Sequence, residues 1–383
     1  MSPRPSPSDA ASGPSAPWLA AGFLLAGLGT VLLGPLLPSL ARDWRLSDSQ
    51  SGLLLFAKFV GAFVGGVSVP RRLRLGIFAG TLLCCLGFAA FALSHGLLPG
   101  CLTLFVSGLG LGQIIASTNI LAGRRYRAHT GSALASLNFF WSFGAVTTGL
   151  LVAALLPRFG MRTPLFCFAL LFLLTGLGGL FGTAAPSSDP HAETSTRKLP
   201  SRTILVFALF LFLYGGLETC LTAWITTFTL RFSDMNLLGG QSGVVLLWAA
   251  LTAGRVIASI ALRFASERTV QRIGLLLSVL FIGALAVAHH GPLISLWCVL
   301  LGLSLAPFFP STFGLLMRGQ PPARTAGFIL AVSGLGAALF PWLMGVVSTH
   351  TGSLRIAMSV PWTLALLLLL LTAVRIQASA SQP

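Results

Sequence analysis

The sequence predicts an all-α membrane protein with twelve transmembrane helices, on the evidence of its composition, its apolar runs and one long polar interval. Of 383 residues, 55% are hydrophobic and 8% are charged, whereas a soluble domain carries about 25% charged residues. Many apolar runs reach about 18 residues, the length that takes a helix across a bilayer. Helices satisfy their own backbone polar groups in lipid, and the sequence lacks the alternating pattern of a membrane barrel.

The apolar runs give the expected spans in chain order. They are 17–41, 51–70, 75–94, 98–122, 132–156, 161–182, 204–230, 241–262, 273–290, 292–317, 325–348 and 354–375. The polar interval 183–203 separates six spans from six. The expected organisation is a tail at 1–16, a six-helix bundle at 17–182, a linker at 183–203, a second six-helix bundle at 204–375 and a tail at 376–383.

The two expected bundles resemble each other in sequence. LFVSGLGLGQIIASTNILAGRR (104–125) parallels VLLGLSLAPFFPSTFGLLMRG (299–319), and 136–162 parallels 330–355. Matching segments lie about 190 residues apart, as expected for parallel repeats about an axis normal to the membrane. Two such pseudo-symmetric bundles that rock around a midplane site would give alternating access.

The basic residues predict the orientation. The net charge of +16 does not indicate nucleic-acid binding, because the basic residues form short clusters between apolar runs rather than one basic domain. With the N-terminus in the cytoplasm, sixteen of the 24 Lys and Arg residues fall in cytoplasmic segments and six in external loops. We therefore expect a multi-pass protein of the inner (plasma) membrane with both termini cytoplasmic. Two six-helix halves make a complete carrier, so we expect a monomer in the lipid bilayer.

Other chemistry is not indicated. The six cysteines lie in or at the edge of apolar runs without metal or disulfide spacing, so we interpret them as packing residues. No phosphate-binding loop, Walker lysine or hydrolytic triad is present, which argues against an enzyme or an ATP-driven pump. We expect no cofactor, with a proton as the coupling ion.

Glu218 is the acidic residue that points most directly to function. It is the only one of eight Asp and Glu residues inside a long apolar run, 204–230. A carboxyl group in hydrocarbon costs several kcal/mol unless it is paired, hydrated or protonated, so such residues mark functional sites. We expect Glu218 to carry a proton; the structural alternative is a permanent ion pair.

Two turns carry a resemblance to the major facilitator superfamily. GGVSVPRRLRLG (65–76) resembles a degenerate form of that superfamily's signature between its second and third spans, with Pro70 where an Asp is usual. The turn GRVIASIALRFASERTVQRIG (254–274) resembles the equivalent turn of the second half. The resemblance implies a secondary transporter with two six-helix bundles.

Four longer strings resemble the fucose/glucose-type sugar:proton symporters within that superfamily. They are FLYGGLETCLTAWITTF (212–228), SLNFFWSFGAVTTGLL (136–151), GLSLAPFFPSTFGLL (302–316) and SGLGAALFPWLMG (333–345). The resemblance implies that Glu218 and Trp224 line a central cavity, with Tyr214 preceding them. The family often has an acidic residue after Gly-Leu-Gly in its fourth span, where this chain has Gln113.

Further polar and aromatic residues inside the spans are candidate substrate contacts. Sugars need amide donors and acceptors and aromatic faces against their CH surfaces. The candidates are Gln113, Asn119, Asn138, Trp141, Tyr214 and Trp224, with Trp248, Phe309 and Trp342 as further aromatic faces. Interhelical hydrogen bonds and ordinary packing are the alternative roles.

Two cations also fall inside spans. Lys58 is expected to act as the counter-charge of Glu218, to bind an anionic substrate, or to sit in a wet cavity without a direct role. Arg255 is expected to extend to the inner surface, with a substrate role as the alternative.

Backbone signals complete the expected architecture. Pro307, Pro310 and Pro341 are expected to interrupt spans ten and eleven. The string GLGLG (108–112) is expected to allow close approach of helices.

The sequence thus favours proton-coupled import of a small molecule, a sugar of the hexose class. Three alternatives stay open: a proton-driven exporter of drugs or metabolites, an uncoupled sugar facilitator, and a non-transporting sensor or assembly subunit.

Overall fold

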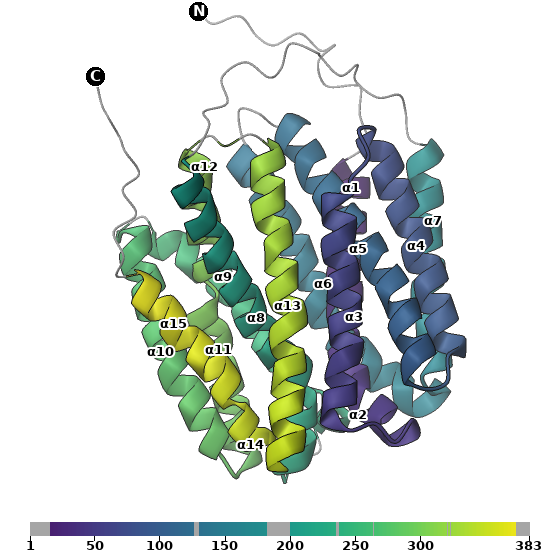
Figure 1. Ribbon diagram of the computed structural model, residues 1–383, viewed down its shortest axis with the longest axis vertical. Helices are drawn as coiled ribbons and strands as arrows, with labels where there is room; N and C mark the ends of the chain where they lie inside the picture. The colour runs from purple at the N-terminus through teal and green to yellow at the C-terminus, as the bar shows by residue number, and fades with distance from the viewer. Residues whose placement is uncertain are drawn as a thin grey trace, which may run out of the picture.

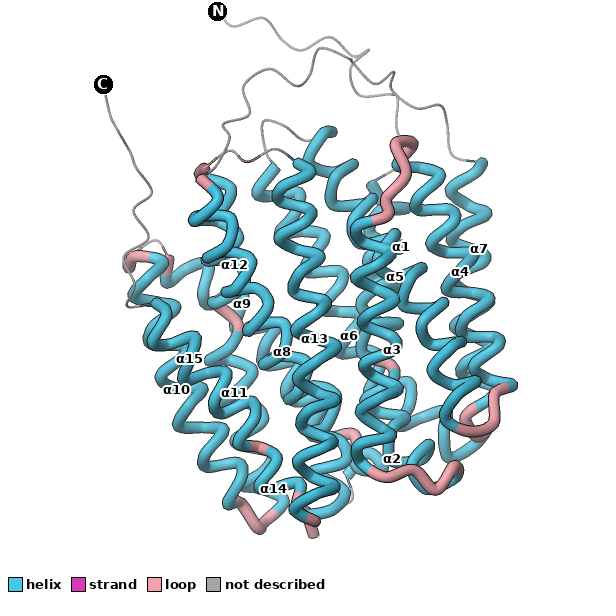
Figure 2. Tube along the Cα trace, in the orientation of Figure 1, coloured by secondary structure: helices cyan, strands magenta, loops and turns pink. Residues whose placement is uncertain are grey.

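The computed structural model describes residues 16–125, 130–181, 200–234, 237–262, 264–319, 321 and 323–372. Within these ranges every regular element is a helix, which confirms the all-α prediction (Figures 1 and 2). Eleven helical segments are long and apolar enough to cross a membrane, and a further apolar helix, Ser242–Ala258, is shorter. The expected tails and most of the expected linker lie outside the described residues.

The first half contains the helices that match spans one to six. They are α1 (Ala16–Val31), α2 (Leu33–Asp43), α3 (Asp48–Val67), α4 (Leu73–Leu93), α5 (Leu97–Arg125), α6 (Thr130–Phe159) and α7 (Arg162–Phe181). Span one is divided into α1 and α2 because Pro35 lacks the N–H that would bond to the carbonyl of Val31. In Figure 1 this half is purple to blue and lies mainly on the right.

The second half contains the helices that match spans seven to twelve. They are α8 (Ser201–Phe232), η3 (Leu237–Gly240), α9 (Ser242–Ala261), α10 (Glu267–Val287), α11 (Gly291–Leu305), α12 (Phe308–Arg318), α13 (Ala323–Thr351), α14 (Leu354–Ala357) and α15 (Ser359–Thr372). Span ten is interrupted at Pro307, as predicted. The prediction for Pro341 is wrong, because α13 continues through it, and Pro310 lies in the first turn of α12, where a proline is tolerated.

The two halves repeat one packing scheme. In the first half α3 and α4 pack on α5, α1 packs on α6, and α4 packs on α7. In the second half α9 and α10 pack on α11, α8 packs on α13, and α10 packs on α15. The parallel sequence segments therefore occupy equivalent places in two similar bundles.

Close helix approach in the first half depends on the GLGLG string. A Cβ atom at Gly108 would overlap the carbonyl oxygen of Lys58 on α3, and one at Gly112 would overlap that of Ala62. A Cβ atom at Gly110 would meet the backbone of α4 at Gly80 and Cys84. Only glycine lets α5 lie this close to α3 and α4, as the sequence predicted.

Within the described ranges, the halves meet mainly through α3 with α13, α6 with α9, and α2 with α8. We call the end of the molecule where α3 begins and α8 ends the latch end, which is the lower end in Figure 1. The opposite end, where α7 ends and α8 begins, is the linker end. Residues on the inter-half helices can contact both bundles, so the functional site is expected along this interface.

Candidate functional site

Glu218 lies near the middle of α8 and faces a cation on the neighbouring helix. Its Oε1 is 3.9 Å from Nη2 of Arg255 on α9, and each side chain is 17% exposed. Glu218 is 14 residues before Phe232, the end of α8, which places it about 21 Å from the latch end. The helix is continuous through Gly215 and Gly216, so its own backbone fixes the direction of the carboxyl group.

The same arginine reaches across to the first half. A guanidinium nitrogen of Arg255 donates a hydrogen bond to the hydroxyl of Ser142 on α6. That hydroxyl donates in turn to the backbone carbonyl of Asn138, at 2.9 Å. Glu218 and Arg255 belong to one half and Ser142 to the other, so this chain of contacts links the carboxyl group to the interface between the halves.

The central ion pair is loose and incompletely hydrogen-bonded. Glu218 Oε1 is buried and makes no hydrogen bond. At 3.9 Å and an effective dielectric constant of about 20, the attraction of the two charges is about 4 kcal/mol. Desolvation of both ions offsets much of that attraction. A carboxyl group held in this way can gain a proton without the loss of a strong hydrogen bond, and the hydrogen bond from Arg255 to Ser142 does not require the carboxylate charge.

Lys58 is not the partner of Glu218, contrary to one expectation. Its side chain is 1% exposed, and Nζ donates to the carbonyl oxygens of Gly29 and Thr30, both at 2.7 Å. These carbonyls lie at the end of α1, where span one is divided, and a cation at a helix C-terminus is favourable. Arg255 supplies the counter-charge instead, so its expected extension to the inner surface is also wrong.

The predicted aromatic residues are held by specific contacts. Trp141 on α6 packs edge-on against Trp248 on α9, with ring centroids 5.2 Å apart, and so joins the two halves next to Ser142. The indole of Trp224 is fully buried and donates to the carbonyl of Pro341 at 3.0 Å. The Tyr214 hydroxyl donates to the carbonyl of Leu305, at the break between α11 and α12, at 3.2 Å.

The amide candidates divide between two helices. Asn138 lies on α6 beside the Ser142–Arg255 contact, whereas Gln113 and Asn119 lie half-buried on α5. Gln113 Oε1 and the hydroxyl of Ser117, one turn later, are both buried without a hydrogen-bond partner. The structure thus places Asn138, Trp141 and Glu218 around one inter-half contact, whereas Gln113 and Asn119 lie on a different helix, α5.

A second ion pair at the latch end was not predicted from the sequence. Arg231, near the end of α8, donates to both carboxylate oxygens of Asp48, the first residue of α3, at 2.7 and 2.6 Å. The hydroxyl of Ser348 on α13 donates to the same carboxylate at 2.6 Å. The Ser49 amide also donates to Thr349 Oγ1 at 2.9 Å. These contacts join the halves, and we call them the latch.

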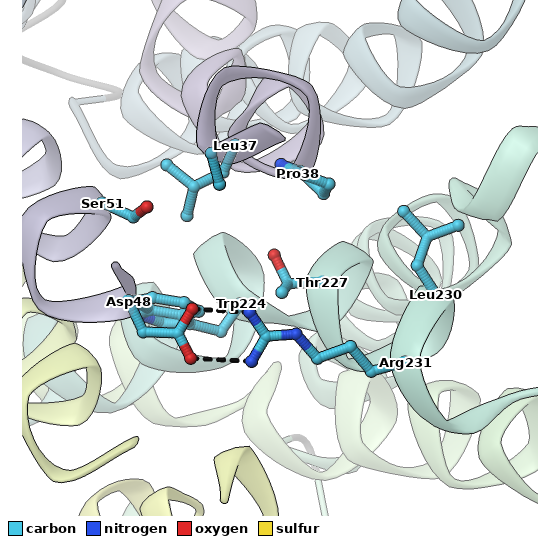
Figure 3. Close-up of a pocket in the computed structure, with 9 residues that line it drawn as sticks. Leu37, Pro38, Asp48, Ser51, Trp224, Thr227, Leu230 and Arg231 are labelled. Carbon is cyan, nitrogen blue, oxygen red and sulfur yellow. Dashed lines mark hydrogen bonds and ion pairs between the residues drawn. The ribbon is translucent and has the colours of Figure 1, made fainter. Parts of the chain in front are cut away.

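A cavity of about 120 Å³ lies directly inside the latch (Figure 3). It is lined by α2, α3 and α8, through Leu37, Pro38, Ala41, Asp48, Ser51, Trp224, Thr227, Leu230 and Arg231. The hydroxyls of Ser51 and Thr227 are buried without hydrogen-bond partners. Trp224 forms part of its wall, six residues after Glu218 and so about 9 Å further along α8.

Two similar bundles of membrane-spanning helices, with a charge pair in one half hydrogen-bonded through Arg255 to Ser142 of the other, form the arrangement expected of a membrane transporter. Residues 19–341 match the family model of the Major Facilitator Superfamily, and the chain therefore belongs to that superfamily.

Known proteins are similar along most of the chain. The glucose/galactose transporter of Brucella abortus is 26% identical over 369 residues, which cover 86% of each chain. A structure of the E. coli fucose:proton symporter has a TM-score of 0.65 and 17% identity, over 94% of this chain and 97% of that one. A nucleoside transporter structure has a TM-score of 0.74 and 13% identity, over 93% and 98%. The two structures share the fold.

Proposed function

We propose that this transporter imports a hexose together with a proton by alternating access. The observation that carries the proposal is the Glu218–Arg255–Ser142 chain, in which the carboxyl group found inside an apolar span is linked to the contact between the halves. The similarity to a glucose/galactose transporter over 86% of both chains supports a sugar as the substrate. The basic residues support an orientation with the linker end in the cytoplasm of the cell.

Each side chain has a defined part in the proposed cycle. Ionised Glu218 attracts Arg255, whereas protonated Glu218 is neutral and tolerates desolvation while the halves move. Arg255, which contacts both groups in this structure, then keeps its hydrogen bond to Ser142 on the other half and loses the attraction of Glu218, so protonation shifts the guanidinium group toward the first half. Asn138 and Trp141 are the proposed sugar contacts beside this point, with amide groups for hydroxyls and a ring for the CH face.

An uncoupled facilitator is the second candidate. Gln113 stands where similar symporters often carry an acidic residue, and Glu218 has a cationic partner in the second half that would suit a permanent ion pair. A drug or metabolite exporter is a third candidate, which predicts resistance without sugar uptake.

The experiment is uptake of labelled galactose and glucose into proteoliposomes, with and without an inward proton gradient. Accumulation above equilibrium only with the gradient is the expected result. Equilibration of the hexose to the same level with and without the gradient would show that the protein is an uncoupled facilitator. The absence of any hexose flux would overturn the assignment of a sugar as the substrate.

A further inference from the structure

The cavity inside the latch has the properties of a binding site rather than of a packing defect. Ser51 and Thr227 are 1% and 6% exposed, and neither hydroxyl oxygen has a hydrogen-bond partner. A buried polar group without a partner costs about 1–3 kcal/mol. In Figure 3 both hydroxyls lie beside the space between α2, α3 and α8. Two such hydroxyls at one cavity indicate that a polar ligand occupies it.

The lining indicates a neutral ligand. Asp48 and Arg231 are the charged residues of the wall, and their opposite charges sum to zero whether the pair is closed or open. The rest of the wall is largely apolar, with Leu37, Pro38 and Leu230 around the hydroxyls and the indole of Trp224. Hydroxyl groups beside apolar and aromatic surface suit a molecule with many hydroxyls and CH faces.

The volume shows what the cavity can hold while the latch is closed. At about 120 Å³ it has space for water molecules. The Asp48–Arg231 pair forms one side of the cavity and joins α3 of the first half to α8 of the second. Separation of the halves at this end would break the pair, enlarge the cavity and free the carboxylate and guanidinium groups for hydrogen bonds to a ligand.

We infer that this cavity is the outer subsite of the transport path, which binds a neutral, hydroxyl-rich ligand of the hexose class when the latch opens and water when it is closed. The inference rests on the proposed sugar transport. The hydroxyls of Ser51 and Thr227 and the freed side chains of Asp48 and Arg231 are its polar contacts, and Trp224, six residues after Glu218 on α8, forms part of its wall.

The test uses a cysteine as a reporter in the cavity wall. Ala41 is small and lines the cavity, so Ala41→Cys leaves the proposed ligand contacts intact. Reaction with a membrane-impermeant maleimide is measured on the full chain in sealed vesicles, relative to the parent with its six native cysteines. Thr351→Cys is the matched control, because Thr351 is exposed at the same end and outside the cavity.

The expected result has four parts. Thr351→Cys reacts rapidly, whereas Ala41→Cys reacts slowly and becomes at least fivefold faster when Arg231→Gln or Asp48→Asn weakens the latch. Galactose slows the reaction of Ala41→Cys and leaves Thr351→Cys unaffected. Addition of Ser51→Ala and Thr227→Val raises the half-protecting galactose concentration at least fivefold. Gluconate, which has similar hydroxyls but a charge, gives no protection.

Each opposite result overturns the inference. Protection that survives the loss of both hydroxyls would mean that galactose acts from another site. Equal protection by gluconate would contradict a neutral ligand. A control cysteine that does not react from outside would place the latch end in the cytoplasm. Protection of Ala41→Cys by galactose reports binding alone. If galactose accumulates but gives no protection, only the proposed subsite is rejected. If galactose protects but does not accumulate, only the proposal of proton-coupled import is rejected.

Discussion

Two of the inter-helix ion pairs in the described part of the chain, Asp48–Arg231 and Glu218–Arg255, differ in geometry and in what they join. Asp48 and Arg231 make two short hydrogen bonds between the halves at the latch end, where the arginine side chain is 41% exposed. Glu218 and Arg255 are 3.9 Å apart inside one half, and a carboxylate oxygen lacks any hydrogen bond. Good geometry near water suits a contact that must break and reform. A loose pair away from water suits a group that must change its charge.

The two ion pairs also differ in how they link the halves. The latch holds them together by direct charge pairing, reinforced by Ser348. The central site reaches the first half through uncharged groups, the Ser142 hydroxyl and the Trp141–Trp248 contact. We expect the latch to set which state is populated, and the central site to make that state depend on protonation.

The largest effect is expected from Arg255→Gln. It leaves Glu218 as a buried carboxylate without a cation, which costs about 3–5 kcal/mol. Thermal unfolding in detergent should show a strong loss of stability, and adding Glu218→Gln should recover most of it. Arg318→Gln is the control, since Arg318 pairs with Glu267 while 68% exposed and should cost less than about 1 kcal/mol. Equal losses of stability in Arg255→Gln and Arg318→Gln would mean that the central pair contributes no more to stability than an exposed ion pair.

The next largest effect is expected from a substitution in the latch. Arg231→Gln removes the bidentate partner of Asp48 and should shift the population toward the state with separated halves, by up to about tenfold for roughly 1.4 kcal/mol. Pulsed electron resonance between spin labels at the exposed positions Arg42 and Thr351 measures that population. The reversed pair, Asp48→Arg with Arg231→Asp, should move the distance distribution back. An unchanged distribution in Arg231→Gln would show that the pair does not hold the halves together.

A smaller effect is expected from Ser142→Ala. It removes the hydroxyl that links Arg255 to the first half, at a cost of about 1–2 kcal/mol. Gradient-driven accumulation should fall severalfold relative to exchange, because protonation of Glu218 no longer affects the inter-half contact. Ser278→Ala is the control, since its hydroxyl bonds to Ser304 within the second half. A drop of equal size in the control would assign the effect to packing.

The smallest effect is expected at Asp234, an acidic residue that lies outside the spans. Asp234 accepts a hydrogen bond from the Gly291 amide at the start of α11, at 2.8 Å, and this bond lowers its pKa below the usual 3.8. A lowered pKa in the folded state means that the bond stabilises the protein above about pH 4 and that this contribution is lost as pH falls below it. Asp234→Asn keeps an acceptor but not the charge, so it should be slightly less stable than the parent at neutral pH and match the parent at acid pH, which flattens the acid limb of the thermal-stability profile. A profile identical to that of the parent would show that the bond contributes nothing measurable.

Much of the fold follows from local chemistry. Apolar runs of bilayer length located the spans, and the missing N–H of Pro307 predicted the break in span ten. The GLGLG string predicted the close packing of α5 because side-chain volume alone decides it. Pro341 was misjudged because a helix packed along its length can absorb one lost hydrogen bond.

The site was less predictable because hydropathy does not reveal which helix faces meet. Glu218 was conspicuous as an acid in an apolar run, whereas its partner could be chosen only from structure. Asp48 and Arg231 are 183 residues apart and both looked like ordinary loop charges. The available signal was their position, since each lies at the same end of a span in a different half.

The most direct test of the account compares two assays on Glu218→Gln in proteoliposomes, with Glu267→Gln as the control for loss of an acid from an exposed pair. Counterflow of galactose needs only movement of the loaded carrier, whereas accumulation needs a proton to be carried. We expect Glu218→Gln to keep counterflow and lose at least tenfold in gradient-driven accumulation, with Glu267→Gln unchanged in both. Full accumulation by Glu218→Gln would contradict the claim that Glu218 carries the coupled proton.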